Sequence, residues 1–427
     1  MSDTSYHKLA QEVPPPPSGC PVDASFSTFS DAYMADPYRE LASRRTETPV
    51  FYSEKLGLVV LTTMEHISQV FLSPDTFSPE NVQDPVFPLD PAAQEVLSAP
   101  DFNPMAVMSN RLEPDHGRIR QYTKGGFSNR RMKVLEPYIR RRAHELIDDI
   151  MAAGSSADFV PTFAAPLPGD TIFRFIGFPE ADDDQLRSWC GERLAFSWGK
   201  PTPDQQIDIA EKMLSYWRYC REFTARKHDD LTDDFASELL ADHDANPDDL
   251  SYREVESIIY GLSFAGHEPV TLLLGNILLC LLQRREEWNA ICADPSLIPS
   301  AIEEVIRYES PQIGWRRIAV EDTSVGGVDI PKGTRIFMSL GSANHQPSEF
   351  DNPTEFDMFR VNSRNNISFG KGNHYCLGAK MARFEARVAL EVITQRLPSL
   401  RLADEQHLDR IPNVSFRGPT SLIVNWD

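Results

Sequence analysis

A glycine-rich run around one cysteine, at residues 369–378, constrains this chain more than any other feature of its sequence. The run reads Phe-Gly-Lys-Gly-Asn-His-Tyr-Cys-Leu-Gly and precedes a segment with helical periodicity. Its three glycines, Gly370, Gly372 and Gly378, remove side chains that would keep a flat ligand away from the sulfur of Cys376. The start of a helix also favours a thiolate, because its unpaired N–H groups carry partial positive charge. We therefore interpret Cys376 as an iron ligand.

This pattern, Phe-Gly-x-Gly-x-His-x-Cys-x-Gly, resembles the haem-binding loop of cytochrome P-450 monooxygenases, and the resemblance extends from about residue 26 to the end. It implies a mainly α-helical P-450 fold, with a large helical domain and a small β-rich subdomain. It also implies a heme b cofactor, iron protoporphyrin IX, ligated by the thiolate of Cys376. In such enzymes the negative sulfur pushes electron density toward bound dioxygen and favours O–O cleavage.

The length allows either two or three average domains or one large domain, and the resemblance implies a single domain at residues 26–427. The prolines at residues 14–17 predict a flexible arm at residues 1–25 before it. The formal net charge of -21 argues against nucleic acid and anionic membranes as partners, because both are polyanions. Neither a long apolar run nor a signal peptide is evident, so we expect a cytoplasmic protein without a membrane anchor. Six scattered cysteines without CxxC pairs predict reduced thiols.

Helical periodicity dominates the chain. Amphipathic patterns predict helices at about residues 118–152, 205–227, 252–284 and 301–308, and apolar runs with turn signals predict strands within 50–63 and 316–337. A proline-rich segment at residues 77–108 lacks periodicity, which predicts a long loop with one short helix. In the resembling family this region covers the substrate, so we expect a lid here. A tolerated surface insertion is the alternative.

The resemblance also implies residues that bind the two haem propionates, since a buried carboxylate needs cationic or hydrogen-bonding partners. His116 and Arg120 lie four residues apart, on one face of a predicted helix. Arg317 and His374 match two further family positions. In isolation each of these residues is more often a surface cation, but their order along the chain favours propionate binding.

A second implied cluster is structural. Glu304 and Arg307 are three residues apart on a helical pattern, and Arg360 follows in the segment Asn-Pro-Thr-Glu-Phe-Asp-Met-Phe-Arg. Glu-x-x-Arg alone carries little information, but the three residues together resemble the family's buried Glu/Arg/Arg cluster. We expect them to stabilise the core behind the haem loop.

The expected oxygen-activating helix departs from the family pattern Ala-Gly-x-(Asp/Glu)-Thr. The chain reads Ala-Gly-His-Glu-Pro at residues 265–269, so Glu268 fills the acid position while Pro269 replaces the threonine. In one interpretation Pro269 fixes an already opened groove; in the other, His267 and Glu268 together replace the acid and the alcohol. Both interpretations make Glu268 the candidate for proton delivery. The alternative is that Glu268 merely pairs with a cation across the groove.

Glu-Pro at this position resembles the bacterial aromatic O-demethylases of the guaiacol type, as do the segments 294–299, 339–345 and 416–422. A small aromatic ether needs an apolar cage with aromatic walls. Phe416 and Trp315 match positions at the family's pocket. Phe87, Phe196 and Trp198 are weaker candidates from the lid and the roof helix, where ordinary core aromatics are equally expected.

The resemblance further implies O2 as co-substrate and an external redox partner, a ferredoxin or flavin reductase fed by NAD(P)H. A basic stretch within residues 118–142 is the expected docking face for an acidic partner, against the alternative of a solvated helix face. O-demethylation of a methoxyphenol-type compound is the leading hypothesis. A peroxide-driven peroxygenase, hydroxylation of a terpene, alkylphenol or fatty acid, and a haem-binding sensor without turnover are the alternatives.

Overall fold

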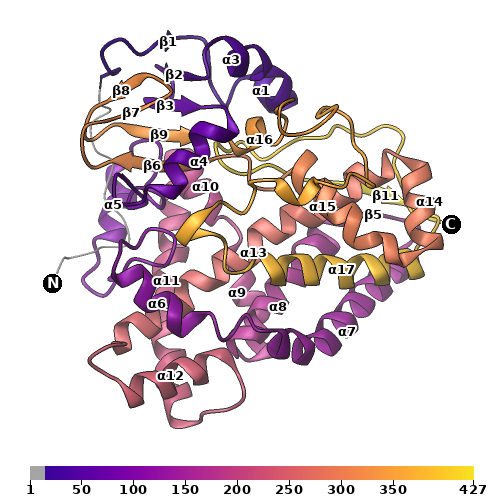
Figure 1. The fold of residues 1–427 in the computed structure, drawn as a ribbon. Coiled ribbons are helices and arrows are strands. Elements are labelled where there is room, and N and C mark those ends of the chain that lie inside the picture. The colour runs from indigo at the N-terminus through magenta and orange to yellow at the C-terminus, as the bar shows by residue number, and fades with distance from the viewer. Residues whose placement is uncertain (1–14) are drawn as a thin grey trace.

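The computed structural model describes residues 15–427, and it separates the chain into a small β-rich corner and a large helical mass (Figure 1). A six-stranded sheet forms that corner in the order β1-β2-β3-β9-β6-β4. Its strands are β1 (Val22–Asp23), β2 (Val50–Ser53), β3 (Leu58–Leu61), β4 (Phe77–Ser78), β6 (Trp315–Ala319) and β9 (Arg335–Met338). Smaller sheets are formed by β5 (Ser156–Asp158), β10 (Arg401–Leu402) and β11 (Ile423–Asn425), and by β7 (Thr323–Val325) and β8 (Val328–Ile330).

Seventeen α-helices supply most of the remaining regular structure in the described residues. They are α1 (Asp31–Ala35), α2 (Pro37–Glu40), α3 (Ala42–Glu47), α4 (Met64–Leu72), α5 (Pro91–Leu97), α6 (Asp115–Thr123), α7 (Asn129–Ala153), α8 (Pro166–Ile176), α9 (Asp183–Cys190), α10 (Arg193–Trp198), α11 (Pro203–Asp229), α12 (Phe235–Ala245), α13 (Tyr252–Leu282), α14 (Arg285–Ala293), α15 (Ile298–Tyr308), α16 (Leu340–Ala343) and α17 (Ala379–Arg396).

The long helix α13 crosses the centre of the molecule, where it packs against α8, α11, α12, α15 and α17. A capping box starts it, because the Ser251 hydroxyl accepts from the Glu254 N–H while the Glu254 carboxylate accepts from the Ser251 N–H. By length and composition α13 could cross a membrane, but 72% of its most apolar window is buried inside the protein. It is therefore the apolar centre of the core, and it forms one wall of the cavity described below.

The predicted helices and strands are largely present, with two differences. The pattern at residues 118–152 is divided between α6 and α7, because Ser128 caps a new helix by accepting from the Arg131 N–H. Part of the predicted arm at residues 1–25, residues 1–14, lies outside the described residues. Within residues 15–25, β1 pairs with β2 and Cys20 is buried. The segment at residues 77–108 contains β4, the short helix α5 and otherwise loop, as predicted.

The Glu/Arg/Arg cluster closes the core beneath the cysteine loop. Arg307 forms a bidentate pair with Glu304, with Nη2 to Oε1 at 2.6 Å and Nε to Oε2 at 2.9 Å, and both side chains have 0% exposure. Arg360 Nε reaches the same carboxylate at 3.1 Å. Next to Arg307 on α15, the Ile306 carbonyl accepts from the hydroxyl of Ser368, which directly precedes the cysteine loop. The cluster therefore fixes the segments on which that loop rests.

Candidate active site

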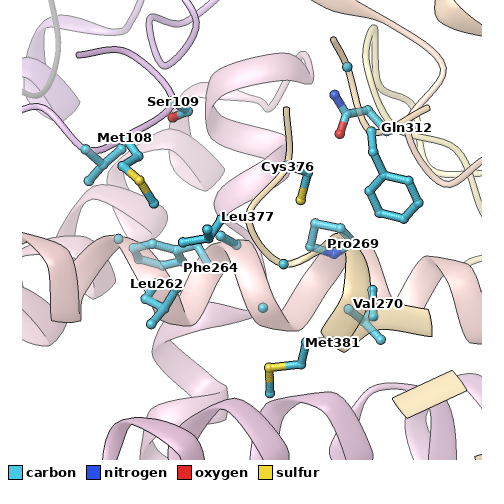
Figure 2. Close-up of a pocket in the computed structure, with 18 of the residues that line it drawn as sticks. Met108, Ser109, Leu262, Phe264, Pro269, Val270, Gln312, Cys376, Leu377 and Met381 are labelled. Atoms are coloured by element: carbon cyan, nitrogen blue, oxygen red, sulfur yellow. The ribbon is translucent and has the colours of Figure 1, made fainter. Parts of the chain in front are cut away.

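A cavity lies between α13, α10, the 107–109 loop segment and the cysteine loop. In Figure 2 Cys376 lies near the middle of the view, with Met108 and Ser109 on one side and Gln312 on the other. The α13 wall contributes small and apolar residues, which include Gly261, Phe264, Ala265, Gly266, Pro269, Val270 and Leu273. The cavity can therefore hold a flat group against the cysteine and a smaller apolar molecule beside α13.

Backbone hydrogen bonds hold the cysteine loop in the shape its glycines allow. Gly370 and Gly372 have φ values of 74° and 70°, a region that disfavours any residue with a Cβ. The Cys376 N–H donates to the Phe369 carbonyl at 2.9 Å, which closes the loop. Burial raises the pKa of the Cys376 thiol, while the N–H groups of Gly378 and Ala379 at the start of α17 lower it. These N–H groups supply the helix-terminal stabilisation of a thiolate predicted from the sequence.

The four predicted propionate ligands lie together beside this loop. The rings of His116 and His374 stack at 3.9 Å, and Arg120 Nη2 donates to the Tyr375 carbonyl at 2.8 Å. Arg317 is 1% exposed and burial lowers its pKa, yet no carboxylate pairs with it among residues 15–427. The buried Nε2 of His116 also lacks a hydrogen-bond partner there.

Buried cations and donors without anions indicate a missing acidic ligand. The residues present therefore fit a haem: Cys376 would ligate the iron, and His116, Arg120, Arg317 and His374 would bind its propionates. When bound, the haem supplies the one-electron and O2 chemistry.

Three of the predicted aromatic residues form one wall of the cavity. Trp198, Trp315 and Phe416 all line it, and their ring centroids are 5.2 to 6.3 Å apart. Trp198 and Trp315 are stacked, while Phe416 presents its edge to each of them. This geometry is favourable for aromatic rings and makes a rigid apolar surface.

The structure does not bring Phe87 and Phe196 to this cavity. Phe196 lies on the opposite face of α10 from Trp198 and packs in a separate core cluster with Leu89 and Met213. The reason is helical periodicity, because residues two apart point to different sides of a helix. Phe87 packs edge-on against Phe29 at 5.5 Å, outside the cavity lining.

On α13, Pro269 lines the cavity, whereas His267 and Glu268 are not part of its lining. The helix continues through Pro269 without a break. His267 faces α8, where its Nε2 lies 3.0 Å from the Ala165 carbonyl and burial lowers its pKa to about 4. The structure thus places His267 away from the cavity, as a neutral donor that ties α13 to α8.

Glu268 points toward α10 rather than into the cavity. Its Oε2 accepts from the Leu194 N–H at 3.0 Å, and burial raises its pKa to about 8. Arg193, next to Leu194, favours the charged form but does not outweigh the loss of solvation. Glu268 is therefore a mostly neutral acid near pH 7, and it holds the proton that a relay would need.

This raised pKa predicts a pH-dependent cost of folding. An unfolded glutamate titrates near pH ~4.3, so between there and about pH 8 the unfolded chain has lost a proton that the folded protein keeps. The free energy of unfolding consequently falls as pH rises through that window, by at most about 5 kcal/mol for this residue. Glu268→Gln, neutral at every pH, is expected to stabilise the protein progressively more from pH 5 to pH 8.

Denaturant unfolding at several pH values measures this difference, with Glu405→Gln on the exposed surface as the matched control. A Glu268→Gln curve parallel to that of the unmodified protein across pH 5 to 8 would contradict a neutral, buried carboxyl.

Sequence reasoning missed several polar residues of the cavity lining, namely Gln83, Ser109, Arg193 and Gln312. It also missed Phe264, one turn before the Glu-Pro pair on α13. Gln83 lies within the predicted lid segment and Ser109 directly follows it, so the region was indicated but not the individual residues. Arg193 belongs to no recognisable motif, because its position in the cavity lining depends on how α10 packs over α13.

Comparison with known proteins agrees with this geometry. The family model for cytochrome P450 matches residues 204–416. The biotin biosynthesis cytochrome P-450 of Bacillus subtilis (strain 168) is 34% identical over 76% of this chain and 80% of its own length. The chain belongs to the cytochrome P-450 family. Its fold is the P-450 fold, and its family cofactor is the thiolate-ligated haem that the cavity fits.

Two solved P-450 structures extend the likeness to nearly the whole chain. Cytochrome P-450 CREJ in complex with (4-ethylphenyl) dihydrogen phosphate has 36% identity and a TM-score of 0.89, covering 94% of this chain and 99% of that one. An intact type IV self-sufficient P-450 monooxygenase has 33% identity and a TM-score of 0.93, and this chain corresponds to 54% of it. Members of the family are monooxygenases that need O2 and a source of electrons.

Proposed function

We propose that this P-450 inserts one oxygen atom from O2 into a small one-ring aromatic substrate, most specifically by O-demethylation of a methoxyphenol-type compound. The wall formed by Trp198, Trp315 and Phe416, in the same cavity as Cys376, is the observation that carries the proposal. Flat aromatic walls select flat apolar rings through edge and face contacts. The complex of the CREJ relative with an ethylphenyl phosphate supports a substrate of one ring.

The proposed reaction balances as follows. Oxygen transfer to the methyl carbon of Ar–O–CH3 consumes one O2, two electrons and two protons, and it releases one water. The product, Ar–O–CH2OH, is a hemiacetal, which splits into the phenol Ar–OH and formaldehyde. Glu268 is the proposed source of a proton, delivered from its position beside α10 once its hydrogen bond with Leu194 opens. His267 is proposed to assist by holding the α13 backbone against α8.

Binding of a small methoxyphenol to the ferric holoenzyme tests the proposal. We expect 2-methoxyphenol to shift the Soret band to high spin, and formaldehyde to form in step with consumed O2 when electrons are supplied. Trp315→Ala removes part of the aromatic wall and is expected to weaken binding by about 10-fold or more. Phe196→Leu, outside the cavity, is the matched control. Tight binding of a fatty acid or terpene, with none of any methoxyphenol, would overturn the proposal.

The electrons are proposed to come from an acidic redox protein that docks beside Cys376. The basic stretch expected for this role is largely neutralised, because Arg118, Arg131, Arg140, Arg141 and Arg142 all form ion pairs with carboxylates. Exposed cations nevertheless surround the cysteine loop. Arg130 and Lys133 lie at the start of α7, Lys380 lies at the start of α17, and Lys371 is in the loop itself.

The two helix starts lie near one another because α7 and α17 run parallel. The Arg140–Glu391 pair and the Arg387–Glu136 pair set their register, which brings residues near 130 beside residues near 380. We call these four exposed cations, Arg130, Lys133, Lys371 and Lys380, the thiolate-side patch. Charge complementarity with an acidic protein would speed its association, and the effect would weaken as salt increases.

Charge reversal in the thiolate-side patch is expected to slow reduction of the holoenzyme. Lys133→Glu with Lys380→Glu should lower the second-order rate with an acidic ferredoxin by about 10-fold or more at low salt. Stopped-flow reduction measures this rate, and Lys55→Glu with Lys332→Glu in the β-rich corner provides the same charge change elsewhere. Equal rates for the two proteins, or a rate independent of ionic strength, would place the docking face elsewhere.

The buried position of α13 supports a water-soluble enzyme, and a cytoplasmic location is part of this proposal.

A further inference from the structure

The side-chain amide of Gln312 lies in the cavity without a protein partner. Gln312 is a partly buried residue just before β6, and it belongs to the cavity lining. Its backbone is fixed by the Ser310 hydroxyl, which donates to the Gln312 carbonyl at 2.8 Å and accepts from the Gln312 N–H at 3.2 Å. Its carboxamide, by contrast, makes no hydrogen bond within residues 15–427. A carboxamide offers one acceptor oxygen and two N–H donors, and here all of them are available to a bound molecule.

Gln312 lies at the edge of the aromatic wall. It pairs with Phe416 in an isolated antiparallel bridge, and residues directly opposite each other in such a bridge point to the same side. Next to this bridge, the Ile313 N–H donates to the Ser415 carbonyl at 2.8 Å. Figure 2 shows the carboxamide on the side of Gln312 nearer to Cys376. The backbone therefore holds the amide at a fixed place beside the surface that would bind the ring.

Other polar side chains of the lining are held by protein groups. Gln83 Nε2 donates to the Ser109 hydroxyl at 2.8 Å. The Ser197 hydroxyl accepts from Arg193 Nη1 at 2.8 Å and donates to the Gln83 carbonyl at 2.8 Å. These bonds join the loop after β4, the segment before α6 and α10, so they are part of the framework of the cavity. The carboxamide of Gln312 has no such structural bond among the described residues.

An amide in a mostly apolar cavity discriminates between ligands. When an apolar ligand enters, the carboxamide of Gln312 loses its hydration and receives nothing in return, which costs free energy. A ligand with a hydroxyl group in reach replaces the lost hydrogen bond. A site built in this way rejects an analogue that lacks the hydroxyl, because the buried polar group is then left unpaired.

We propose that Gln312 is a specificity-determining residue that binds the free hydroxyl of a phenolic substrate. The inference rests on the proposed aromatic ether and names its class more closely, as a ring that carries a phenol hydroxyl besides the methoxy group. The Oε1 atom of Gln312 would accept from the phenol O–H, while the aromatic wall holds the ring in the cavity with Cys376.

Two ligands of nearly equal size test the inference, by Soret titration and by calorimetry of the ferric holoenzyme. 2-Methoxyphenol and 2-methylanisole differ only in a hydroxyl against a methyl group. We expect 2-methoxyphenol to bind about 10-fold more tightly or better. Gln312→Met keeps an unbranched side chain but lacks the amide, and it should bring the two affinities within about threefold of each other. The affinity for 2-methylanisole should stay nearly unchanged, which a general loss of structure would not allow.

Three further variants accompany this comparison. Gln312→Glu keeps acceptor oxygens at the same position and should retain part of the preference for the phenol. Gln283→Met, at an exposed position after the end of α13 and outside the cavity lining, should change neither affinity. Should Gln312→Met fail to take up haem, Gln312→Leu supplies the same comparison.

The outcomes separate this inference from the proposed function. Equal affinity for the two ligands in the unmodified enzyme would overturn the role of Gln312 and leave the aromatic ether standing. A preference for the phenol that survives removal of the amide would do the same. If neither ligand binds while a fatty acid or terpene does, the proposed function falls, and the inference falls with it.

Discussion

Cys376→Ser is expected to remove the haem-thiolate character of the enzyme and to lower monooxygenation by more than about 100-fold, beyond the 10- to 100-fold typical of altered outer-shell partners. The serine hydroxyl is a far weaker donor than a thiolate and is not deprotonated by the N–H groups of Gly378 and Ala379 that favour the thiolate. The carbon monoxide difference spectrum of the reduced protein reports the ligand directly, and turnover reports its consequence.

Cys292→Ser is the matched control, because Cys292 is a partly exposed free thiol on α14, away from the cavity. Its spectrum and turnover should equal those of the unmodified enzyme. A thiolate spectrum retained in Cys376→Ser, or lost in Cys292→Ser, would contradict the assignment of the iron ligand.

Arg307→Ala is expected to destabilise the protein by about 3 to 5 kcal/mol and to reduce haem incorporation sharply. The guanidinium holds both oxygens of Glu304 and donates to the carbonyls of Asn344, Pro353 and Glu355. Its removal leaves a buried carboxylate and loosens segments that pack beneath the cysteine loop. Denaturant unfolding measures the loss of stability, and the ratio of Soret to protein absorbance measures haem content.

Two variants test whether the stranded charge is the cause. The double variant Glu304→Gln with Arg307→Met removes both charges and should recover part of the stability, because a neutral pair of similar volume avoids an unpaired ion. Arg364→Ala is the surface control, since its side chain is 79% exposed and lies 4.0 Å from Glu303. Full haem content and unchanged stability in Arg307→Ala would contradict the structural role of the cluster.

The residues around Cys376 could be predicted from the sequence because their geometry is local. Gly370, Gly372 and the start of α17 are close in the chain to the sulfur that they position, so spacing and residue type specify the loop. The Glu304–Arg307 pair was accessible for the same reason, since the two residues occupy one face of one helix. Arg317 and Arg360 are distant in sequence, and only the family resemblance linked them to their clusters.

The sequence predicted less well which side of a helix faces the cavity. Phe196 and Trp198 are two residues apart in a six-residue helix, and the packing of α10 decides which of them faces the cavity. For a related reason the sequence did not show which cations of the basic stretch stay unneutralised. Several of its arginines pair with carboxylates on α8, α13 and α17 and on the loop before α12, which are distant in the chain. For Glu268 the sequence predicted the position but not the orientation. The residue occupies the position of the family acid, but its carboxyl points to the Leu194 N–H.

The sequence by itself determined the glycine-shaped loop around Cys376, the fold class and the buried Glu304–Arg307 pair, since each depends on residues a few positions apart or on a long, specific family pattern. Only the tertiary structure decided which aromatics line the cavity, which cations stay exposed beside the cysteine loop, and that Gln83, Ser109 and Arg193 meet. Those three residues come from the loop after β4, the segment before α6 and α10. Their proximity arises from packing over α13, where burial and hydrogen bonding, rather than any local motif, set the distances.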